Sequence, residues 1–367
     1  MQNRISDTTA TVGRPIGVFD SGIGGLTVAR EIARRLPHES ILYLGDTLRC
    51  PYGPRPLAEI KGYARQISSW LAGQDVKLVV IACNSATAAA LECIQQESPV
   101  PVIGVVEPGA RAAVLSTLAR RVGVIGTAAT IDSGIYARAI RSLDAGITTF
   151  SAATPRFVEM VEQGLRLDRN PFEDIMAHTS AIYIRPAFLE IARDYLEPLK
   201  RCRIDTLVLG CTHYPLLAPL LSQVVGPEVC IISSAEETAR EVEEVLARRG
   251  QLVPDARAPK HRFATTAADT EEFAALGAAI LAHPMSRVQT VAIAELEDAL
   301  ARFEEGLARA ERALEEAPGE ASARAEGAPV QAGEDLARSE GGRPSVTLLP
   351  FGQEGGGYHV DDARERP

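Results

Sequence analysis

The sequence predicts an α/β protein with two pseudo-symmetric, doubly wound α/β domains, mostly parallel sheets and an active site between the domains, plus a C-terminal helical and disordered extension. Short β-branched runs alternate with alanine-rich stretches of helical spacing, which is the pattern of βαβ units. A faint internal repeat, IGVFDSGIGG (16–25) and VGVIGTAATI (122–131), indicates two halves built on one plan. Because a cysteine follows each copy at a later strand end, the halves would bring Cys83 and Cys211 to opposite sides of one cleft.

The predicted strands share a run of β-branched residues that ends in a polar or small residue. They fall within residues 14–22, 40–46, 76–85, 100–108, 120–127, 204–212 and 228–234. Parallel sheets bind ligands beyond the carboxyl ends of their strands, so the residues that end each run matter most for function. These residues are Asp20, Ser21, Asp46, Cys83, Asn84, Glu107, Thr127, Cys211, Thr212 and His213.

The composition changes at about residue 284. Apolar residues at spacings of three and four, from Ile293 to Leu314, predict an amphipathic helix within 284–317, although Gly306 weakens it by about 1 kcal/mol. This stripe would fit either the body of the same chain or a second subunit. Residues 318–367 lack periodicity and predict a largely disordered tail.

Charge and hydropathy exclude several classes of protein. The net charge of −10 and the absence of Lys/Arg clusters disfavour direct contact with nucleic acid. No apolar run is long enough for a membrane span, and MQNRISDTTATVGRP (1–15) has no signal-peptide core. We therefore expect no membrane association and a cytoplasmic location.

The six cysteines form no CxxC pair, which disfavours a zinc ribbon or a thioredoxin-like site. In a reducing compartment they would remain thiols. Cys93, Cys202 and Cys230 are interpreted as small buried hydrophobic residues.

The sequence also bears on two other kinds of site. Cys83, Cys211, His213 and Asp20 could ligate zinc, but they come from three distant segments without a close-spaced pair, so no metal is expected. The turn GVFDSGIGGLTVARE (17–31) resembles a dinucleotide fingerprint, but Thr27 stands where the third glycine should be and Asp20 lies where a pyrophosphate would bind. The glycines would instead let backbone N–H groups approach an anion, either a carboxylate or a phosphate.

Proton transfer by thiols fits the pattern better. A thiol near a helix N-terminus can be shifted toward thiolate, and a neighbouring acid or base can exchange its proton. Asp20 could serve Cys83, and His213 could serve Cys211. One such group on each face of a tetrahedral carbon would invert it, and no lysine argues for a pyridoxal phosphate cofactor. Taken singly, Asp20 could be a helix cap and His213 a core histidine; their joint occurrence beside paired cysteines favours catalysis.

Six motifs together make the chain similar to the cofactor-independent glutamate racemases of the aspartate/glutamate racemase superfamily. They occur in family order over roughly residues 14–283: GVFDSGIGGLTV (17–28), YLGDTLRCPYG (43–53), VIACNSATA (80–88), GVVEPGA (104–110), VGVIGTAATI (122–131) and LGCTHYPLL (209–217). The resemblance implies a first domain of residues 14–104 completed by 215–283, a second domain of residues 105–214, and an active site between them. It also implies a homodimer, a possible contact with DNA gyrase, and supply of D-glutamate for peptidoglycan.

The resemblance assigns acid/base roles to Cys83 and Cys211, with Asp20 and His213 as their helpers. It implies a set of substrate-binding residues: Asp20, Ser21, Tyr52, Gly53, Asn84, Ser85, Thr87, Thr127, Thr130, Glu162, Thr212 and His213. Neither a metal nor a cofactor is expected. The alternatives are a racemase of aspartate or another acidic amino acid, and a binding protein that inhibits gyrase.

The chain departs from the family pattern at three places. The segment TPRFVEMVEQG (154–164) replaces something like CPLFVPLVEEG, so Thr154, Arg156 and Glu159 are unusual. Cys50 precedes the substrate-contacting PYG and is interpreted as a gap-filler rather than a redox liability. The extension after residue 283 has no counterpart in the usual enzyme.

Overall fold

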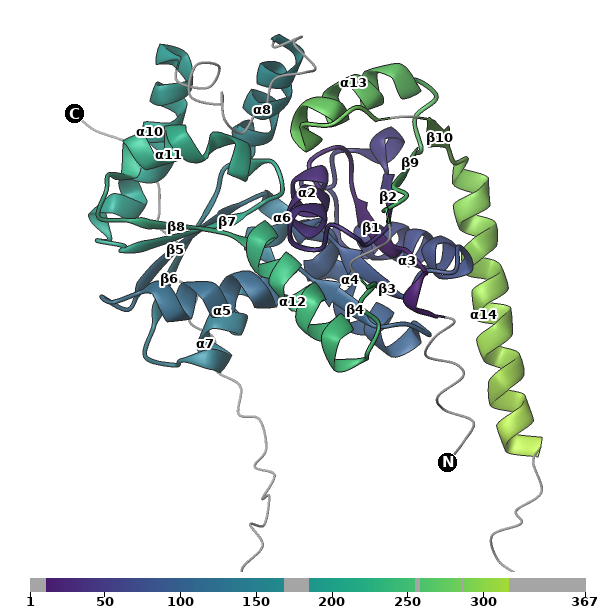
Figure 1. Ribbon diagram of the computed structural model, residues 1–367. Coiled ribbons are helices and arrows are strands. Elements are labelled where there is room, and N and C mark those ends of the chain that lie inside the picture. Colours follow the sequence, from purple (N-terminus) through teal and green to yellow (C-terminus); the bar gives the residue numbers. More distant parts are fainter. Residues whose placement is uncertain (1–10, 168–184, 255–257, 286, 317–367) are drawn as a thin grey trace, which may run out of the picture. The chain divides into compact units, whose positions relative to one another are not determined.

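The computed structural model describes residues 11–167, 185–254, 258–285 and 287–316. Two parallel sheets organise this part of the chain (Figure 1). The predicted tail, 318–367, lies outside the described residues.

The first sheet has six strands in the spatial order β10-β9-β2-β1-β3-β4, and every neighbouring pair is parallel. Its strands are β1 (Ile16–Asp20), β2 (Ile41–Gly45), β3 (Leu78–Ile81), β4 (Val102–Gly104), β9 (Arg262–Thr265) and β10 (Val288–Thr290). The second sheet is also wholly parallel, in the order β6-β5-β7-β8. Its strands are β5 (Arg121–Gly126), β6 (Thr148–Ala153), β7 (Thr206–Gly210) and β8 (Cys230–Ser233). We call the sheets and the helices packed on them the first and second lobes.

Helices connect the strands in both lobes. Those before β5 are α2 (Leu26–Arg35), the 3-10 turn η1 (Thr47–Arg49), α3 (Leu57–Gly73), α4 (Asn84–Glu97) and α5 (Val106–Ser116). Those between β5 and β8 are α6 (Ala128–Asp132), α7 (Ile135–Leu143), α8 (Arg156–Leu167), α10 (Pro186–Arg201), the 3-10 turn η2 (Tyr214–Leu217) and α11 (Ala218–Val225). The last are α12 (Ser234–Arg248), α13 (Thr270–Leu281) and α14 (Ile293–Glu316).

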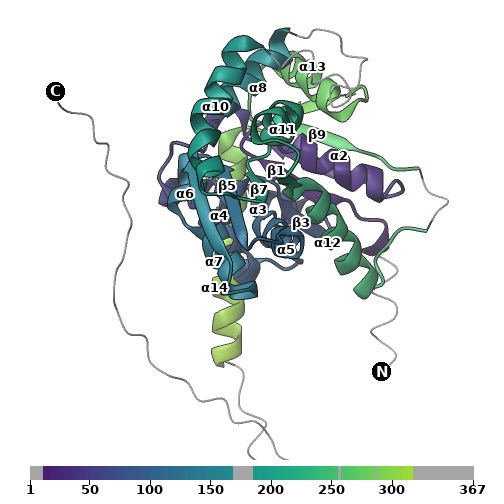
Figure 2. The ribbon, with the colours of Figure 1, turned by 90° about the vertical axis from the view of Figure 1, so that its left-hand side faces the viewer.

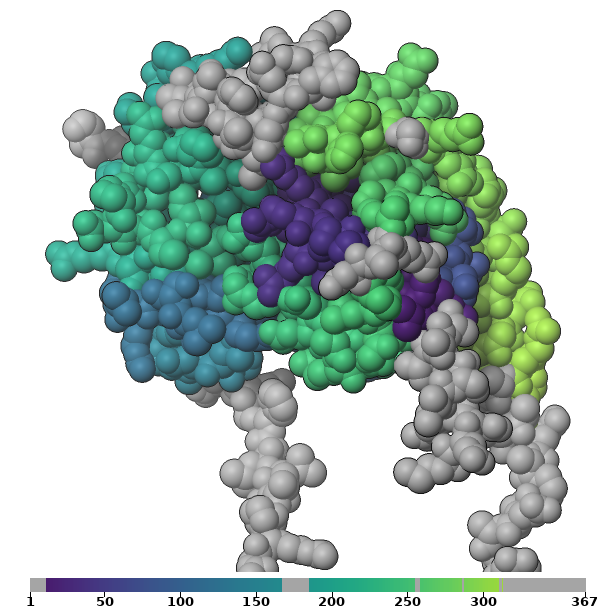
Figure 3. Space-filling view, in the orientation of Figure 1, coloured from purple at the N-terminus to yellow at the C-terminus, as the bar shows by residue number. Residues whose placement is uncertain are grey.

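Strand periodicity distributes the apolar residues of the first sheet over two cores. Alternate side chains of a strand point to opposite faces, so Ile16 and Val18 enter one core and Phe19 the other. The first core is covered by α2 and α12, and the second by α3 and α4. In both ribbon views α2 lies between α12 and α13 (Figures 1 and 2). Figure 3 shows the same relation at the surface, where green residues from later in the chain flank the purple residues near the N-terminus.

The predicted two-sheet α/β class and all seven predicted strands are confirmed. Three strands were not expected. β6 is an edge strand with half-exposed or exposed side chains and no β-branched apolar run, while β9 and β10 have only four and three residues. None of them carries the buried β-branched run that revealed the others.

The sheets divide the chain differently from the expected ranges at two places. β8 lies within 215–283, assigned to the first domain, but it pairs with β7 in the second sheet. This placement extends the repeat, because β8 supplies a further parallel neighbour for the strand that ends before Cys211. β10 lies within 284–317, expected to be helical, but it adds an edge strand to the first sheet.

The amphipathic helix after β10 packs against the first lobe. Leu296 is fully buried and joins the core beneath α3, and Arg65 pairs with Glu304 at 3.0 Å. Farther along, Phe303 is half-buried and Leu307 is 37% exposed. The start of the predicted stripe therefore covers the body of its own chain, and the side chains of Ala310 and Leu314 lie outside the described residues. Across the described helices, none is long and apolar enough to cross a lipid bilayer.

Candidate active site

A cavity of about 230 Å³ is lined by loops at the carboxyl ends of strands from both sheets. Most of the predicted site residues line it: Ser21, Tyr52, Gly53, Cys83, Asn84, Ser85, Thr127, Cys211, Thr212 and His213. The volume is below the roughly 300–1,000 Å³ of pockets for drug-sized ligands, so a small metabolite suits it better than a dinucleotide. Asp20, Thr87, Thr130 and Glu162 lie outside the lining.

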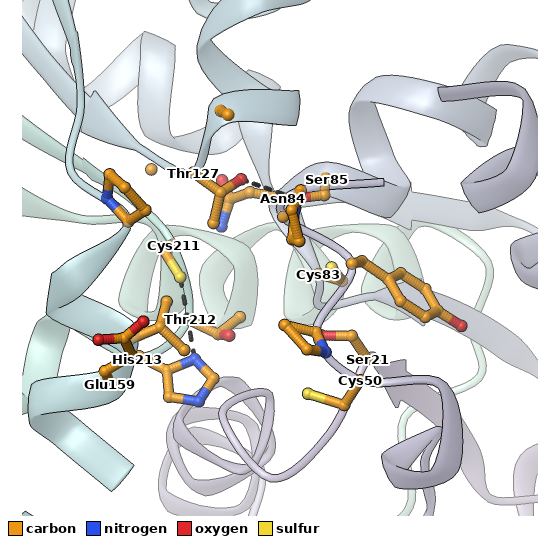
Figure 4. A pocket seen from close by; sticks show the side chains of 18 residues that line it. Ser21, Cys50, Cys83, Asn84, Ser85, Thr127, Glu159, Cys211, Thr212 and His213 are labelled. Carbon is orange, nitrogen blue, oxygen red and sulfur yellow. Dashed lines mark hydrogen bonds between the residues drawn. The ribbon is translucent and has the colours of Figure 1, made fainter. Parts of the chain in front are cut away.

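The two thiols belong to different lobes and face the cavity from opposite walls (Figure 4). Cys83 stands between β3 and α4, where its extended backbone makes it the N-cap residue. Cys211 directly follows β7. Both are buried and unpaired. Both thiols therefore reach the cavity in the same way, because each cysteine follows the end of a buried parallel strand.

At Cys83, burial acts against the general tendency of a helix N-terminus to shift a thiol toward thiolate. Burial and the nearby charge of Asp20 raise the pKa of Cys83, while the backbone N–H of Ala86 opposes the shift. Desolvation outweighs the helix terminus because the thiol is almost wholly removed from solvent.

Asp20 ends β1 and organises the turn before α2. Its Oδ2 accepts hydrogen bonds from the N–H groups of Gly22 at 3.1 Å and Gly25 at 3.0 Å. The Thr212 hydroxyl donates to Oδ1 at 3.4 Å, which links the two lobes. A Cβ at Gly25 would lie 2.4 Å from Asp20 Cβ, so only glycine fits there. These turn donors are occupied by Asp20, and they are not available to a phosphate.

His213 lies beside Cys211 and in front of Glu162. Its Nδ1 is 3.8 Å from Cys211 Sγ, and its Nε2 is 3.7 Å from Glu162 Oε1. Burial lowers the pKa of His213, but Cys211, Glu162 and Asp20 outweigh it and raise the pKa to about 10. His213 in turn lowers the pKa of Glu162. At neutral pH the imidazolium form of His213 therefore lies between the sulfur of Cys211 and the carboxylate of Glu162.

A cluster of hydroxyls joins the lobes on the other side of the cavity. Ser85 Oγ lies 2.9 Å from Thr127 Oγ1 and 3.3 Å from Thr130 Oγ1. Beside it, Asn84 Oδ1 accepts a hydrogen bond from Tyr136 at 2.8 Å, and the buried Asn84 Nδ2 has no partner within the described residues. Thr87 instead donates to the backbone of Ile81 at 3.1 Å, so its hydroxyl supports the strand end.

The loop that carries Tyr52 is held by Asp46, a fully buried acid. Asp46 accepts hydrogen bonds from Tyr52 Oη, from Arg49 Nε at 2.7 Å and from Thr266 Oγ1 at 2.9 Å. Cys50 lies in the same loop, packs over Gly22 and also lines the cavity. Burial, with the charges of Glu162 and Asp20, raises its pKa, so this third thiol is held protonated.

The three departures from the family pattern have different positions. Thr154 is buried, and its Oγ1 lies 2.9 Å from Tyr214 Oη. Glu159, in the first turn of α8, lines the cavity, whereas Arg156 is exposed outside it. Tyr136, Tyr214 and Asp46 were not proposed as site residues. Asp46 is one of the residues that end a predicted strand, so its position already indicated a functional role. No sequence signal places either tyrosine near the cavity.

The remaining cysteines lie away from the site. Cys93 and Cys202 are half-buried, and Cys230 is exposed. The interpretation of Cys230 as a buried residue is therefore wrong, because it begins the edge strand β8. Among the residues that the structure describes, no group of three or more His, Cys, Asp or Glu side chains is arranged to hold a metal ion.

Comparison with known proteins gives a consistent result. The Asp/Glu/Hydantoin racemase family profile matches residues 16–242. A glutamate racemase from Exiguobacterium sibiricum is 45% identical over 278 residues, covering 76% of this chain and 96% of that protein. The structure of a glutamate racemase isoform from Bacillus anthracis is 42% identical with a TM-score of 0.68, covering 76% of this chain and 97% of that one. A glutamate racemase from Francisella tularensis, solved in complex with D-glutamate, is 31% identical with a TM-score of 0.68, covering 77% and 98%.

The matched region includes both cysteines, all of the second sheet and the loops around the cavity. The resemblance inferred from the six motifs is thereby confirmed. The chain belongs to the Asp/Glu/Hydantoin racemase family and, within it, to the glutamate racemases.

Proposed function

We propose that this glutamate racemase inverts Cα of glutamate by two-thiol acid/base proton transfer, with Cys83 acting on one face of the carbon and Cys211 on the other. The observation that carries the proposal is that two buried thiols from different lobes line one cavity. Inversion requires a base that removes the Cα proton from one side and an acid that returns a proton to the other. The product, D-glutamate, would supply peptidoglycan synthesis.

Unequal surroundings support different resting roles for the two thiols. Burial and Asp20 raise the pKa of Cys83 and keep it a proton donor. The imidazolium of His213, with a pKa of about 10, directs Nδ1–H toward the sulfur of Cys211. In one direction Cys211 then removes the Cα proton and Cys83 supplies a proton to the other face, and the roles exchange for the opposite enantiomer.

Neutral donors are proposed to bind the substrate carboxylates, because the described lining of the cavity contains no Lys or Arg. Asn84 offers its unpartnered Nδ2, and the first turn of α4 offers backbone N–H groups that no side chain caps. The other proposed contacts are Ser21, Tyr52, Gly53, Ser85, Thr127 and Thr212. Thr87, Thr130 and Glu162 would act behind these groups, through Ile81, Ser85 and His213.

The thiol roles are tested by Cys83→Ser and Cys211→Ser. Each substitution replaces a thiol by a hydroxyl of much higher pKa, and we expect racemisation to fall by several orders of magnitude. Cys93→Ser, on α4 but outside the cavity, is the matched control and should retain activity. Near-normal racemisation by either active-site variant would refute the two-thiol scheme.

Substrate choice is tested by solvent deuterium incorporation at Cα, followed by NMR. L-Glutamate and D-glutamate should both exchange with inversion, and L-aspartate should not. Exchange of aspartate at a similar rate would favour the broader acidic amino-acid racemase. No exchange by folded, reduced protein would leave gyrase binding as the leading alternative.

We also propose a homodimer, a DNA gyrase contact and a cytoplasmic location. All six cysteines are unpaired, which suits a reducing compartment. Leu307, exposed on α14 beyond the part that covers the first lobe, supports a role for this helix in binding a partner. In Leu307→Glu, the sedimentation coefficient should fall and less gyrase should be captured. In Glu305→Gln, both quantities should remain unchanged. If both quantities were unchanged in Leu307→Glu, Leu307 and α14 would contribute to neither the dimer contact nor the gyrase contact.

A further inference from the structure

We infer that Tyr136, in the second lobe, fixes the orientation of the Asn84 amide, in the first, and so acts as a positioning residue for a substrate carboxylate. The inference rests on the proposed substrate-binding role of Asn84. Tyr136 lies in α7, outside the lining of the cavity, and its hydroxyl reaches across to the start of α4.

The phenol of Tyr136 is held in one place. Its side chain is 2% exposed and packs in the core of the second lobe. A Cβ on Gly210 would lie 3.1 Å from Tyr136 Cε2, and a Cβ on Gly109 would lie 3.4 Å from its Oη. Glycine at both positions lets the ring approach the backbone, so the hydroxyl has little freedom to move away from Asn84.

Hydrogen-bond direction decides which end of the amide faces the cavity. A phenol can donate or accept, so its contact with an amide does not by itself distinguish oxygen from nitrogen. Burial raises the pKa of Tyr136, so the phenol keeps its proton and can donate it. The phenol proton is then directed to Asn84 Oδ1, 2.8 Å away.

With Oδ1 engaged, the amide presents Nδ2 as a donor. Asn84 is 3% exposed, lines the cavity, and leaves Nδ2 without a partner among the described residues. A buried donor without a partner is unfavourable, so a carboxylate that accepts from Nδ2 removes this penalty on binding. An amide rotated by 180° would instead present its oxygen to the carboxylate and repel it.

Tyr136→Phe tests the inference, since it keeps the ring and removes only the hydroxyl. We expect KM for glutamate to rise about tenfold in both directions, with kcat changed less than threefold. Tyr195→Phe, which alters another ring packed in the second lobe, is the control and should leave KM unchanged.

A double-mutant cycle separates positioning from general destabilisation. Asn84→Ala should raise KM, and adding Tyr136→Phe to it should produce no further rise. Independent multiplication of the two effects, or an unchanged KM in Tyr136→Phe alone, would overturn the inference. If Asn84→Ala itself left KM unchanged, the proposed binding role of Asn84 would fail first.

Discussion

Glu162→Gln tests how the imidazolium of His213 is maintained, because it removes the carboxylate charge and keeps the shape of the side chain. At 3.7 Å between Nε2 and Oε1, Coulomb's law with an effective dielectric constant of about 20 gives about 4.5 kcal/mol as an upper value. Glu162 is 28% exposed, so solvent screening reduces the useful interaction to about 1–2 kcal/mol. We therefore expect the alkaline limb of the kcat/KM profile to move down by about one pH unit.

The sign of the stability effect follows from the two pKa shifts. The pKa of His213 is raised from 6.5 to about 10, so its contribution is fully present below pH 6.5 and is lost as the pH rises through about 10. The pKa of Glu162 is lowered from 4.5, so its contribution is present above that value and is lost as the pH falls through the folded-state pKa. The difference in Tm between wild type and Glu162→Gln should therefore be greatest between about pH 4.5 and pH 6.5. It should shrink as the pH rises toward about 10 and as it falls through the folded-state pKa of Glu162.

The assay combines pH–rate profiles in both directions with an NMR titration of the His213 imidazole. Glu272→Gln is the matched control, because Glu272 pairs with Arg166 at 3.2 Å, as Glu162 does at 3.7 Å, but forms no recorded contact with His213. Glu272→Gln should change neither the pH–rate profile nor the NMR titration of His213. If Glu162→Gln also left the imidazole titration unchanged, Glu162 would not be the charge partner of His213.

Two further predictions concern loop placement and stability. Gly53→Ala should raise KM, because the new Cβ would lie 2.8 Å from Thr127 Cβ and would push the loop away from the second lobe. Gly62→Ala is the control, because a Cβ at this position of α3 meets open space. Equal KM values for the two variants would contradict this view. Lys77→Met should lower the free energy of unfolding by about 3–5 kcal/mol in urea titrations, since it strands the buried Glu39, 2.6 Å from Lys77 Nζ. Adding Glu39→Leu should restore part of the loss, and a stability equal to wild type in Lys77→Met alone would refute the argument.

Much of the fold was predictable because buried parallel strands leave a local signature. LVVI (78–81) and TLVLG (206–210) are continuous apolar runs, and each is buried on both faces. The edge strand TTFSAA (148–153) is paired on one side and half-exposed, so its sequence resembles a loop. Its place in the sheet depends on pairing with β5, which no local pattern encodes.

The site was predictable where chemistry coincides with a strand end. Cys83 and Cys211 were identified in this way, and both line the cavity. Tyr136 was not, because it acts through one hydrogen bond to a residue 52 positions away in the chain. The raised pKa of Cys83 was also missed, since burial is a property of the packed lobes and not of the helix start beside the thiol.

The pseudo-symmetry of the two lobes extends to the placement of the thiols but not to their electrostatics. Cys83 lies near the carboxylate of Asp20, and Cys211 lies beside the imidazolium of His213. The equilibrium constant between enantiomers is unity, so kcat/KM must be equal in the two directions whatever the surroundings are. The asymmetry can therefore appear only as matched differences in kcat and KM. In the proposed scheme the proton pattern is reversed after each turnover, with charge on Cys83, and burial together with the charge of Asp20 disfavours this state. We therefore expect the protons to return quickly to the resting pattern after turnover in one direction. In the other direction the reversed pattern must form first, and this slows the reaction.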